Sequence, residues 1–327
     1  MDKTVGGLDS ITSKYFEDYE KLSEYKRRTS QNQKDMKKKV LNARKSQTAV
    51  EEYGPLIANA YDVEDIDVRE YVVQECKEYL NRIKVTDEGR QQIVLSTQNQ
   101  VEEDWYKLRR MRLTASNFGK IAKQRSSTDP VNLIRAMLYS GNLSTKEIEY
   151  GKTHESSAST QYELEKGIIV QKIGLYVHKD FCWLGCSPDG IIDDPQEGKG
   201  LIEIKCISIP EYQDQLISSI VTSKKNFYLK KVNDALALKQ NHDYYFQVQG
   251  QLEVMDLNFC DFVVYNEVGI FVERIYRSKG FWKDKIFDKL KRFFFLVDLP
   301  ELALKQIKLK KMPINLSKFT VEELYNE

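Results

Sequence analysis

The sequence has little of what builds disulfide scaffolds, histidine metal sites or membrane spans. It contains five cysteines, an odd and scattered set, and three histidines. Disulfide cross-links are therefore not expected, and a zinc site at Cys182 and Cys186 lacks a second Cys/His pair with ligand spacing. No apolar run is long enough to cross a bilayer, and the N-terminus lacks a signal-peptide core. We expect an intracellular protein without a membrane partner.

The chain also lacks an excess of charge of either sign. Its 50 Lys and Arg nearly balance 49 Asp and Glu, which leaves a net charge of +1. No global basic field attracts nucleic acid, so any DNA binding must use local patches. A length of 327 residues, 41% of them apolar and 30% charged, predicts one large soluble domain or one domain with an extension.

The most informative stretches are CSPDGII at 186–192 and LIEIKCI at 201–207. If the second stretch is a β-strand, alternation places Glu203 and Lys205 side by side on its polar face. The Asp-, Gly- and Pro-rich segment between the stretches predicts a turn. The two stretches would then pair as an antiparallel hairpin, which brings Asp189 near Glu203.

Two acids and a lysine on one polar face are the chemistry of metal-dependent phosphodiester cleavage. Asp189 and Glu203 would hold Mg²⁺, and Lys205 would position or activate the attacking water. The alternative is an ordinary strand with an exposed Glu-x-Lys face, preceded by a Pro-Asp-Gly turn.

A second candidate site lies in the stretch WYKLRRMRLTASNFGKI at 105–121. Three arginines, Arg109 and Arg112 among them, precede a Thr-Ala-Ser element in which Ser116 can cap a new helix. A helix N-terminus with free N–H groups, a hydroxyl and a guanidinium makes a phosphate site. The alternative is an ordinary basic helix with a serine cap.

A further carboxylate is expected inside the protein. Residues 144–147 form a capping box that opens a helix extending to about Glu165. Helical spacing places Glu155 on the face to be buried, together with Ile148, Ala158 and Tyr162. A buried carboxylate needs a cation or hydrogen-bond donors. Glu155 is therefore either paired with a core arginine or an additional metal ligand.

The remaining patterns outline the other elements. The first 50 residues, with a basic run at 34–40, predict an exposed helix or a disordered arm. A basic stretch at 223–231 is either a DNA-facing loop or a solvated one. Glutamines recur at Gln247, Gln249 and Gln251, where they can donate to phosphate or water or lie on a polar surface. We also expect a helix from Asp67, strands within 173–192, a mostly helical connection over 211–240, a helix over 243–255, a hairpin of 260–265 with 270–276, and a helix over 281–296.

In order, the motifs are Trp-x-x-x-Arg…Thr-Ala-Ser, Gly-x-x-x-Glu, Ser-Pro-Asp-Gly, Glu-x-Lys-Cys and Gln-x-Gln. This series resembles the phage lambda exonuclease family, or YqaJ-type viral recombinase domain, of the PD-(D/E)XK nucleases. The likeness extends from Trp105 to the phenylalanines at 293–295.

The resemblance implies an α/β fold of the α+β type, with a restriction-endonuclease-like core in which helices flank a central mixed sheet. Residues 1–100 would form a charged helical extension, residues 101–305 the nuclease domain, and residues 306–327 a basic tail.

The resemblance also implies a metal site. Asp189 and Glu203, with the main-chain carbonyl of Ile204 and the helix glutamate Glu155, would bind Mg²⁺, for which Mn²⁺ can substitute. Lys205 would serve the attacking water.

The other matched positions concern the DNA end and the support of the centre. Arg109 and Ser116 would take a terminal 5′ phosphate, with Arg112 as a further DNA contact, and Gln249 would support the active centre. The chain departs from the family in having bulky residues around Met111, where glycine is common. It also has a long connection before Gln249.

The implied function is a Mg²⁺-dependent 5′→3′ exonuclease that acts on linear double-stranded DNA in viral or transposon-type recombination. The alternatives are an endonuclease of the same superfamily and a DNA-binding module without catalysis. Expected partners are duplex DNA with 5′-phosphate ends, a single-strand annealing protein and a second copy of the chain. The sequences KVTDE at 84–88 and QNQ at 98–100 are similar to those of eukaryotic, virus- or transposon-derived members, which favours a nuclear or viral setting.

Overall fold

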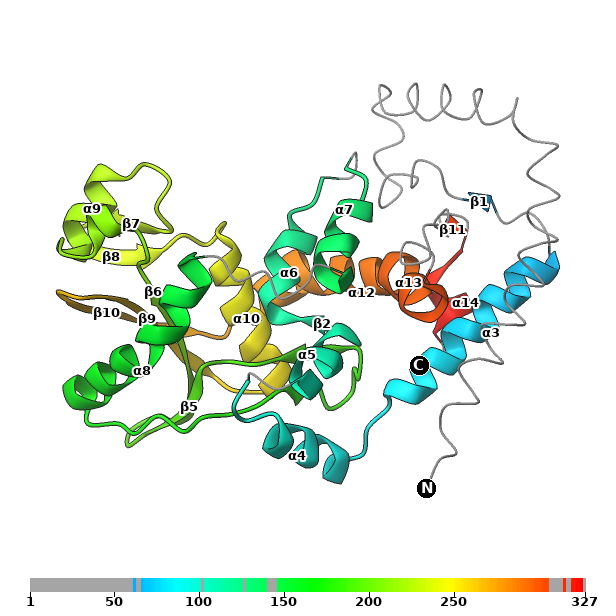
Figure 1. Cartoon of the computed structure of the whole chain (residues 1–327), viewed down its shortest axis with the longest axis horizontal. Coiled ribbons are helices and arrows are strands. Elements are labelled where there is room, and N and C mark those ends of the chain that lie inside the picture. Colours follow the sequence, from blue (N-terminus) through cyan, green and yellow to red (C-terminus); the bar gives the residue numbers. More distant parts are fainter. Residues whose placement is uncertain are drawn as a thin grey trace. The chain divides into compact units, whose positions relative to one another are not determined.

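The computed structural model describes most of the chain after residue 65 (Figure 1). The described residues are 61–62, 66–100, 103–125, 128–139, 146–305, 314–315 and 319–325. The predicted N-terminal arm with its basic run, and the cap residues Ser144 and Thr145, lie outside them. The chain divides into two compact units. The terminal unit comprises residues 1–78, 125–133 and 295–327, and the core unit comprises residues 79–124 and 134–294.

The core unit is built on a four-stranded mixed sheet of order β10-β9-β6-β5. Strand β6 (Gly198–Cys206) pairs antiparallel with β5 (Gly190–Asp194) and parallel with β9 (Phe259–Asn266). Strand β10 (Gly269–Tyr276) follows β9 as an antiparallel hairpin. The predicted α/β fold with a central mixed sheet flanked by helices is confirmed.

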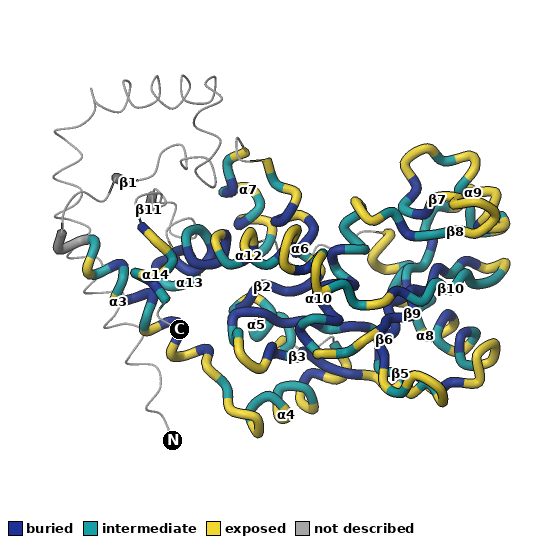
Figure 2. The backbone as a smooth tube through the Cα atoms, turned by 180° about the vertical axis from the view of Figure 1, so that it is seen from behind, coloured by how far each residue is buried: buried dark blue, intermediate teal, exposed yellow. Residues whose placement is uncertain are grey.

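Alternation along β6 sorts its side chains into two cores. Leu201 faces helix α10 (Asp243–Met255), where it packs with Val248 and Leu252. Ile202 and Ile204 face helix α8 (Lys146–Lys166), where Ala158 and Tyr162 cover them. Burying each large apolar side chain stabilises the fold by roughly 1.5–3 kcal/mol. Figure 2 shows β6 and β9 in the buried, dark blue part of the core unit.

Helix α8 departs in one respect from its predicted stripe. Ala158 and Tyr162 are fully buried as expected, whereas Ile148 near the start of the helix is 45% exposed. The helix buries its second half against the sheet, so the apolar spacing overstates the length of the contact.

Helix α10 carries side chains toward β6 and packs closely on helix α6 (Ala115–Ala122). A Cβ atom on Gly250 would lie 2.3 Å from the ring of Phe118, and one on Gly119 would lie 2.5 Å from Oδ1 of Asp243. Both positions therefore need glycine. This contact sets the start of α6 close beside the helix that covers the polar face of β6.

A second sheet, of order β2-β4-β3, connects α6 to the start of β5. Strand β2 (Leu113–Thr114) leads into α6 and runs parallel to β4 (Leu184–Cys186). Strand β3 (Tyr176–Val177) pairs antiparallel with β4. The chain then passes from β4 to β5 through three residues, Ser187, Pro188 and Asp189.

The N-terminal helical elements follow the predicted periodicity. Helix α3 (Ile66–Ile83) begins one residue before the expected start, and its apolar stripe is buried at Val72, Cys76, Leu80 and Ile83. Helices α4 (Asp87–Ser96) and α5 (Glu103–Arg110) follow.

The connection over 211–240 differs from the predicted, mostly helical one. It contains a 3-10 turn (Pro210–Tyr212), helix α9 (Ile217–Ser223) and a β-hairpin of β7 (Leu229–Val232) with β8 (Ala235–Leu238). The hairpin turns at Asn233, whose φ of 54° is left-handed. Asn tolerates this conformation better than most residues, and Asn-Asp is a recognised turn signal.

The C-terminal helical run is longer than the predicted 281–296. It comprises α11 (Lys279–Phe281), a π-helix (Trp282–Phe287), α12 (Asp288–Phe293), a second π-helix (Phe294–Asp298) and α13 (Leu299–Leu304). Within the segment expected to be a basic tail, β11 (Ile314–Asn315) pairs with β1 (Tyr61–Asp62), and α14 (Val321–Leu324) has a capping box. The short helices α7 (Val131–Ile134) and η2 (Arg135–Tyr139) complete the described elements. No helix among the described residues is long and apolar enough to cross a membrane.

Candidate active site

The structure brings together the three residues of the predicted acid–lysine cluster. Glu203, in the middle of the sheet, is only 2% exposed, and the ammonium of Lys205 forms an ion pair with its Oε1. Asp189 lies at the neighbouring strand, where its Oδ2 accepts a hydrogen bond of 2.6 Å from the main-chain N–H of Ile204.

Strand register explains why Asp189 and Glu203 meet. Gly190 pairs with Ile202 at the end of the β5–β6 ladder, so the next residue on each strand is Asp189 and Glu203. Strand β6 continues beyond this point along β9, and its edge toward β5 no longer has a strand beside it. Asp189 bonds to that edge at Ile204 in place of a ladder partner. The predicted antiparallel hairpin is confirmed, with a turn limited to residues 195–197.

Two glutamines of α10 hold the Glu203 carboxylate from above. Gln247 Nε2 donates to Oε1 and Gln251 Nε2 donates to Oε2, each over 2.6 Å. Their spacing of i and i+4 places both on one face of the helix. The sequence pattern showed the repeated glutamines, but it did not show which of them face β6.

The role expected for Gln249 needs correction. Gln249 is fully buried, and its amide donates to the carbonyl of Tyr276 over 2.9 Å while its Oε1 accepts from the N–H of Ser278. It therefore joins α10 to the end of β10. Because residues two apart on a helix point in nearly opposite directions, Gln249 cannot share a face with Gln247 and Gln251.

The charge of Glu203 acts on the ionisable groups around it. Burial and then the charge of Glu203 raise the pKa of Asp189, and the same two causes raise the pKa of Glu155 on α8. For Lys205, burial disfavours the charged form, but Glu203 and Asp189 outweigh it and raise its pKa. Asp189 and Glu203 thus share the ammonium of Lys205 while Glu155 adds a third negative charge nearby, which is the electrostatic setting that a bound divalent cation relieves.

The donor set fits Mg²⁺. Among the described residues, no three His, Cys, Asp or Glu side chains are arranged to enclose a metal by themselves. Mg²⁺ commonly binds through one or two carboxylates and keeps several waters. Gln251 Oε1 is buried beside Glu203 and accepts no hydrogen bond within the described part of the chain, so it can accept one from such a water. Asp189 and Glu203 would hold the ion, with Glu155 close enough to act on their charge.

The predicted phosphate residues Arg109 and Ser116 also meet. Arg109, at the end of α5, donates from Nη2 to the hydroxyl of Ser116 over 3.1 Å, and its guanidinium lies 4.3 Å from the centre of the Trp105 ring. Helix α6 begins at Ala115 with Thr114 as its N-cap, so Ser116 lies in the first turn and is not the cap. The Thr114 and Ser116 hydroxyls are hydrogen-bonded at 3.3 Å.

Arg112 lies elsewhere, which corrects its expected role in DNA binding. The residue is 4% exposed, and its guanidinium donates to the carbonyls of Cys182, Leu108 and Ile83 over 2.9 to 3.1 Å. All of these partners are main-chain oxygens inside the fold, so Arg112 stabilises the start of β2 and is too deeply buried to reach a phosphate on the surface.

Ser187 is a site residue that the sequence reasoning missed. The indole N–H of Trp105 donates to its hydroxyl over 3.2 Å, and the same indole lies against Arg109. Ser187 precedes Pro188 and Asp189, so Trp105 connects the arginine–serine pair to the loop that carries a carboxylate of the cluster. Its place in the Ser-Pro-Asp-Gly motif was the available signal.

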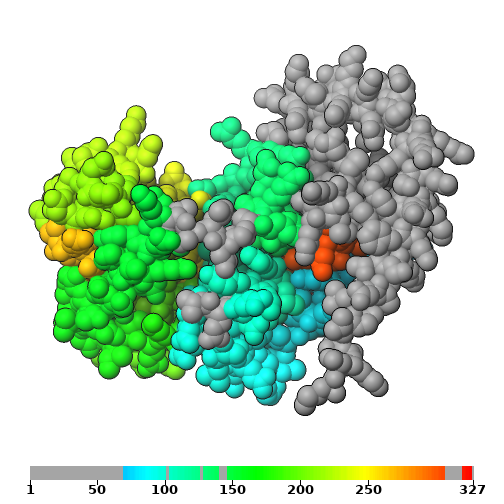
Figure 3. Space-filling view, viewed as in Figure 1, coloured from blue at the N-terminus to red at the C-terminus, as the bar shows by residue number. Residues whose placement is uncertain are grey.

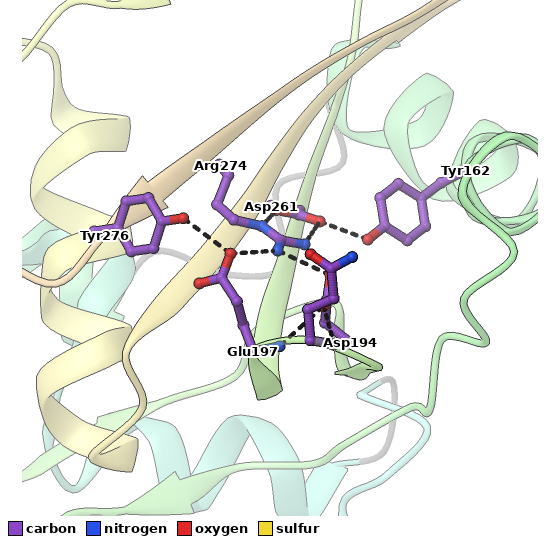
Figure 4. Close-up of polar contacts among 7 residues, drawn as sticks. Tyr162, Asp194, Glu197, Asp261, Arg274 and Tyr276 are labelled. Atoms are coloured by element: carbon purple, nitrogen blue, oxygen red, sulfur yellow. Dashed lines mark hydrogen bonds and ion pairs between the residues drawn. The ribbon is translucent and has the colours of Figure 1, made fainter.

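A partly buried ion-pair network fixes the far end of the hairpin (Figure 4). Arg274 of β10 forms two hydrogen bonds of 2.8 and 2.9 Å to Asp261, which also accepts from Tyr162 of α8 at 2.6 Å. Arg274 also reaches Asp194 and Glu197 in the β5–β6 turn, at 2.8 and 3.0 Å. The network ties the turn to β9, β10 and α8.

Comparison with known protein families finds a similarity over this region. Residues 104–258 match the YqaJ-like viral recombinase domain. This segment is similar to the YqaJ-like viral recombinase domain. It contains the Arg109–Ser116 pair, the Asp189–Glu203–Lys205 cluster and both glutamines that bind Glu203, whereas helices α3 and α4 precede it.

Individual relatives of the YqaJ-like domain are distant. The curated protein R354 of Acanthamoeba polyphaga mimivirus, described as uncharacterized, is 24% identical over 169 residues. The match covers 50% of this chain but only 28% of that protein. An alkaline exonuclease from Laribacter hongkongensis covers 64% of this chain and 97% of its own, with 26% identity and a TM-score of 0.47. A phage-related exonuclease from Haemophilus somnus 129PT covers 63% and 99%, with 14% identity and a TM-score of 0.39.

Proposed function

We propose that the chain is a Mg²⁺-dependent deoxyribonuclease that degrades linear duplex DNA from 5′-phosphate ends, in the 5′→3′ direction. The observation that carries the proposal is the Glu203–Lys205 ion pair with Asp189 opposite it, inside a YqaJ-like domain. An ordinary exposed strand would leave Glu203 in water, whereas here it is buried and bonded by three donors.

Each side chain has a defined task in phosphodiester hydrolysis. Asp189 and Glu203 would hold the metal, which supplies Lewis-acid polarisation of the scissile phosphate and a more acidic water. Gln247 and Gln251 fix both oxygens of Glu203, so that its carboxylate cannot rotate. Lys205 faces the same point, where its ammonium stabilises a hydroxide nucleophile and the charge that develops on the phosphate.

End recognition is assigned to the arginine–serine pair. Arg109 and Ser116 present a guanidinium and a hydroxyl at the first turn of α6, where N–H groups point outward. A dianionic 5′ phosphate gains charge-assisted hydrogen bonds there that a 5′ hydroxyl lacks. Trp105 and Ser187 connect this pair to the Asp189 loop, which fits a substrate held by its end while a bond nearby is cut.

The alternatives explain less of the geometry. An endonuclease has no terminal phosphate to hold, which leaves the Arg109–Ser116 pair without a task. A DNA-binding module without catalysis has no need for Asp189, Glu203 and Lys205 together on one face. Three expectations from the sequence stay predictions: a single-strand annealing protein as partner, association with a second copy of the chain, and a nuclear or viral setting.

The test uses the full chain with linear and closed-circular duplex of one sequence, in Mg²⁺, in Mn²⁺ and in EDTA. Linear duplex with 5′ phosphates should be degraded in either metal and be stable in EDTA. The matched control is Glu203→Gln, which should not cut in any buffer. Efficient cutting of closed circles would favour the endonuclease, and cutting in EDTA would exclude the metal mechanism.

A further inference from the structure

The segment just before the YqaJ-like domain packs into that domain without a gap. Figure 3 shows the cyan surface, which includes α4, beside the green surface of the core unit. The hydroxyl of Thr97 accepts from the N–H of Leu175 over 2.8 Å, and Gln98 donates to the carbonyl of Lys172 over 2.9 Å. A Cβ atom on Gly174 would lie 2.3 Å from the carbonyl oxygen of Val94. The contact therefore excludes even a methyl group.

Gln100 extends this contact to the active site. Its side-chain amide donates to two carbonyls, that of Ile173 over 2.8 Å and that of Pro188 over 2.9 Å. The Pro188 carbonyl belongs to the peptide group that joins Pro188 to Asp189. Fixing that carbonyl fixes the peptide plane from which the Asp189 side chain extends.

The backbone of Gln100 is held in an unfavourable conformation. Its φ is 55°, in the left-handed region that glutamine rarely adopts. This conformation directs the side chain between Ile173 and Pro188, where both amide hydrogens are used. A conformation that costs free energy persists where the surrounding contacts determine it, and such positions cluster at functional sites.

The loop that carries Asp189 is thus held at successive points. Trp105 donates to the hydroxyl of Ser187, Gln100 donates to the carbonyl of Pro188, and the N–H of Ile204 donates to Asp189 itself. Of these donors, Gln100 lies outside residues 104–258.

We propose that Gln100 is a positioning residue for the metal ligand Asp189, and that the functional nuclease domain therefore begins with α4. The inference rests on the proposed function, because it assigns Gln100 an effect on metal binding. Partners of a metal ligand outside the coordination shell typically change metal affinity or activity by about 10- to 100-fold when mutated. Loss of the Gln100 amide should act on metal affinity and leave DNA affinity unchanged.

The decisive variant is Gln100→Asn, compared with Gln98→Asn in the same full chain. Asn keeps an amide and tolerates the left-handed conformation, but it is one methylene too short to reach Pro188. Gln98→Asn makes the same chemical change on the neighbouring contact to Lys172, which does not involve the Asp189 loop. Mg²⁺ alone is titrated calorimetrically into each protein without DNA, and initial cleavage rates are measured across Mg²⁺ concentrations.

Gln100→Asn should weaken Mg²⁺ binding by about 10-fold, and saturating Mg²⁺ should restore most of the cleavage rate with unchanged KM for DNA. Gln98→Asn should bind Mg²⁺ like the wild type. If the wild type binds Mg²⁺ and cuts DNA but the two variants bind Mg²⁺ equally well, the inference about Gln100 is wrong and the proposed function stands. A wild type that does neither would overturn the proposed function.

A second variant guards against a folding defect. Gln100→Gly removes the side chain and relaxes the backbone at φ 55°, so it should be no less stable than Gln100→Asn. Both should show the same loss of Mg²⁺ affinity. A loss of thermal stability without a change in Mg²⁺ affinity, in whichever variant folds, would show that Gln100 is only structural.

Discussion

The side-chain amide of Gln251 donates to Oε2 of Glu203 over 2.6 Å, and neither residue is more than 2% exposed. Both side chains are held inside the fold, so the bond fixes the direction in which the carboxylate points. Helix α10 is therefore part of the site, although none of its residues belongs to the acid–lysine cluster.

The glutamines of α10 offer a matched pair of variants. Gln251→Leu removes a donor from Glu203 and should lower the cleavage rate by about 10- to 100-fold. Gln249→Leu should leave the rate of the folded protein near normal but lower the free energy of unfolding by about 1–3 kcal/mol, because a buried N–H and carbonyl lose their partner. Cleavage assays and urea unfolding of both variants measure the two effects. The reverse pattern would restore Gln249 to the active centre.

Removal of a metal-binding carboxylate should abolish cleavage. Asp189→Asn and Glu203→Gln keep side-chain volume and remove a negative charge, so the fold should be retained while Mg²⁺ binding and cutting are lost. DNA binding should hold or become tighter, because one charge facing the phosphate disappears. Circular dichroism, Mg²⁺ calorimetry and DNA gel shifts separate these effects. Near-normal cutting by either variant would disprove the metal assignment.

Lys205 should matter for the chemical step and not for holding Mg²⁺. In Lys205→Ala the ammonium that stabilises developing charge is gone, and the rate should fall by roughly 10²- to 10³-fold, as for the loss of one preorganised donor. Mg²⁺ affinity should be kept, because Asp189 and Glu203 are intact and lose a competing cation. Single-turnover rates at saturating Mg²⁺ are the measurement. Unchanged turnover would mean that Glu203 and Lys205 form only a structural pair.

Arg109 and Arg112 should separate end recognition from stability. Arg109→Ala should reduce the rate advantage of 5′-phosphate over 5′-hydroxyl duplex, while residual cutting continues at the intact metal site. Arg112→Ala should keep that advantage in the folded fraction but destabilise the fold, since three buried carbonyls lose their donor. Initial cleavage rates on the two duplexes measure end recognition, and unfolding curves measure the stability of each variant. If the wild type cuts 5′-phosphate and 5′-hydroxyl duplexes at equal rates, Arg109 and Ser116 do not form a pocket for the terminal phosphate.

The Arg274 network should be a main support of the hairpin. Arg274→Ala leaves the buried Asp261 without its cation, which typically costs about 3–5 kcal/mol of unfolding free energy. The control is Lys107→Ala, which is 60% exposed and whose partner Glu103 is 82% exposed, and there the loss should stay below about 1 kcal/mol. Guanidinium unfolding of the two variants measures the difference. Similar losses would mean that burial of Asp261 adds nothing.

The hairpin and helix α10 could be predicted because each depends on local patterns. Period-two alternation in β6 fixes the faces of Glu203 and Lys205, and the polar turn fixes the direction of the partner strand. The predicted limits of α10, Asp243 and Met255, are those of the structure. Here local propensity and tertiary packing agree.

The missed features depend on contacts between distant segments. Which glutamine faces Glu203 depends on how α10 rolls on the sheet, and that is set by the contact of Gly250 with Phe118. Strand β8 consists of alanine and leucine, which favour a helix. It is held as a strand by pairing with β7 and by the bond from the N–H of Leu238 to Glu273. The sequence does not distinguish Arg112 from the neighbouring arginines, because its burial depends on main-chain carbonyls of distant segments.

The short turn between β5 and β6 sets a limit on chain length. Only residues 195–197 separate the two strands, and Arg274 anchors Asp194, just before the turn, and Glu197, its last residue. One inserted residue that shifted the pairing by one position would bring Asp189 opposite a residue of the other face of β6. Natural variation in the length of this turn should therefore be rare. An insertion here would move Asp189 away from Glu203, and the site would be lost although neither carboxylate had been replaced.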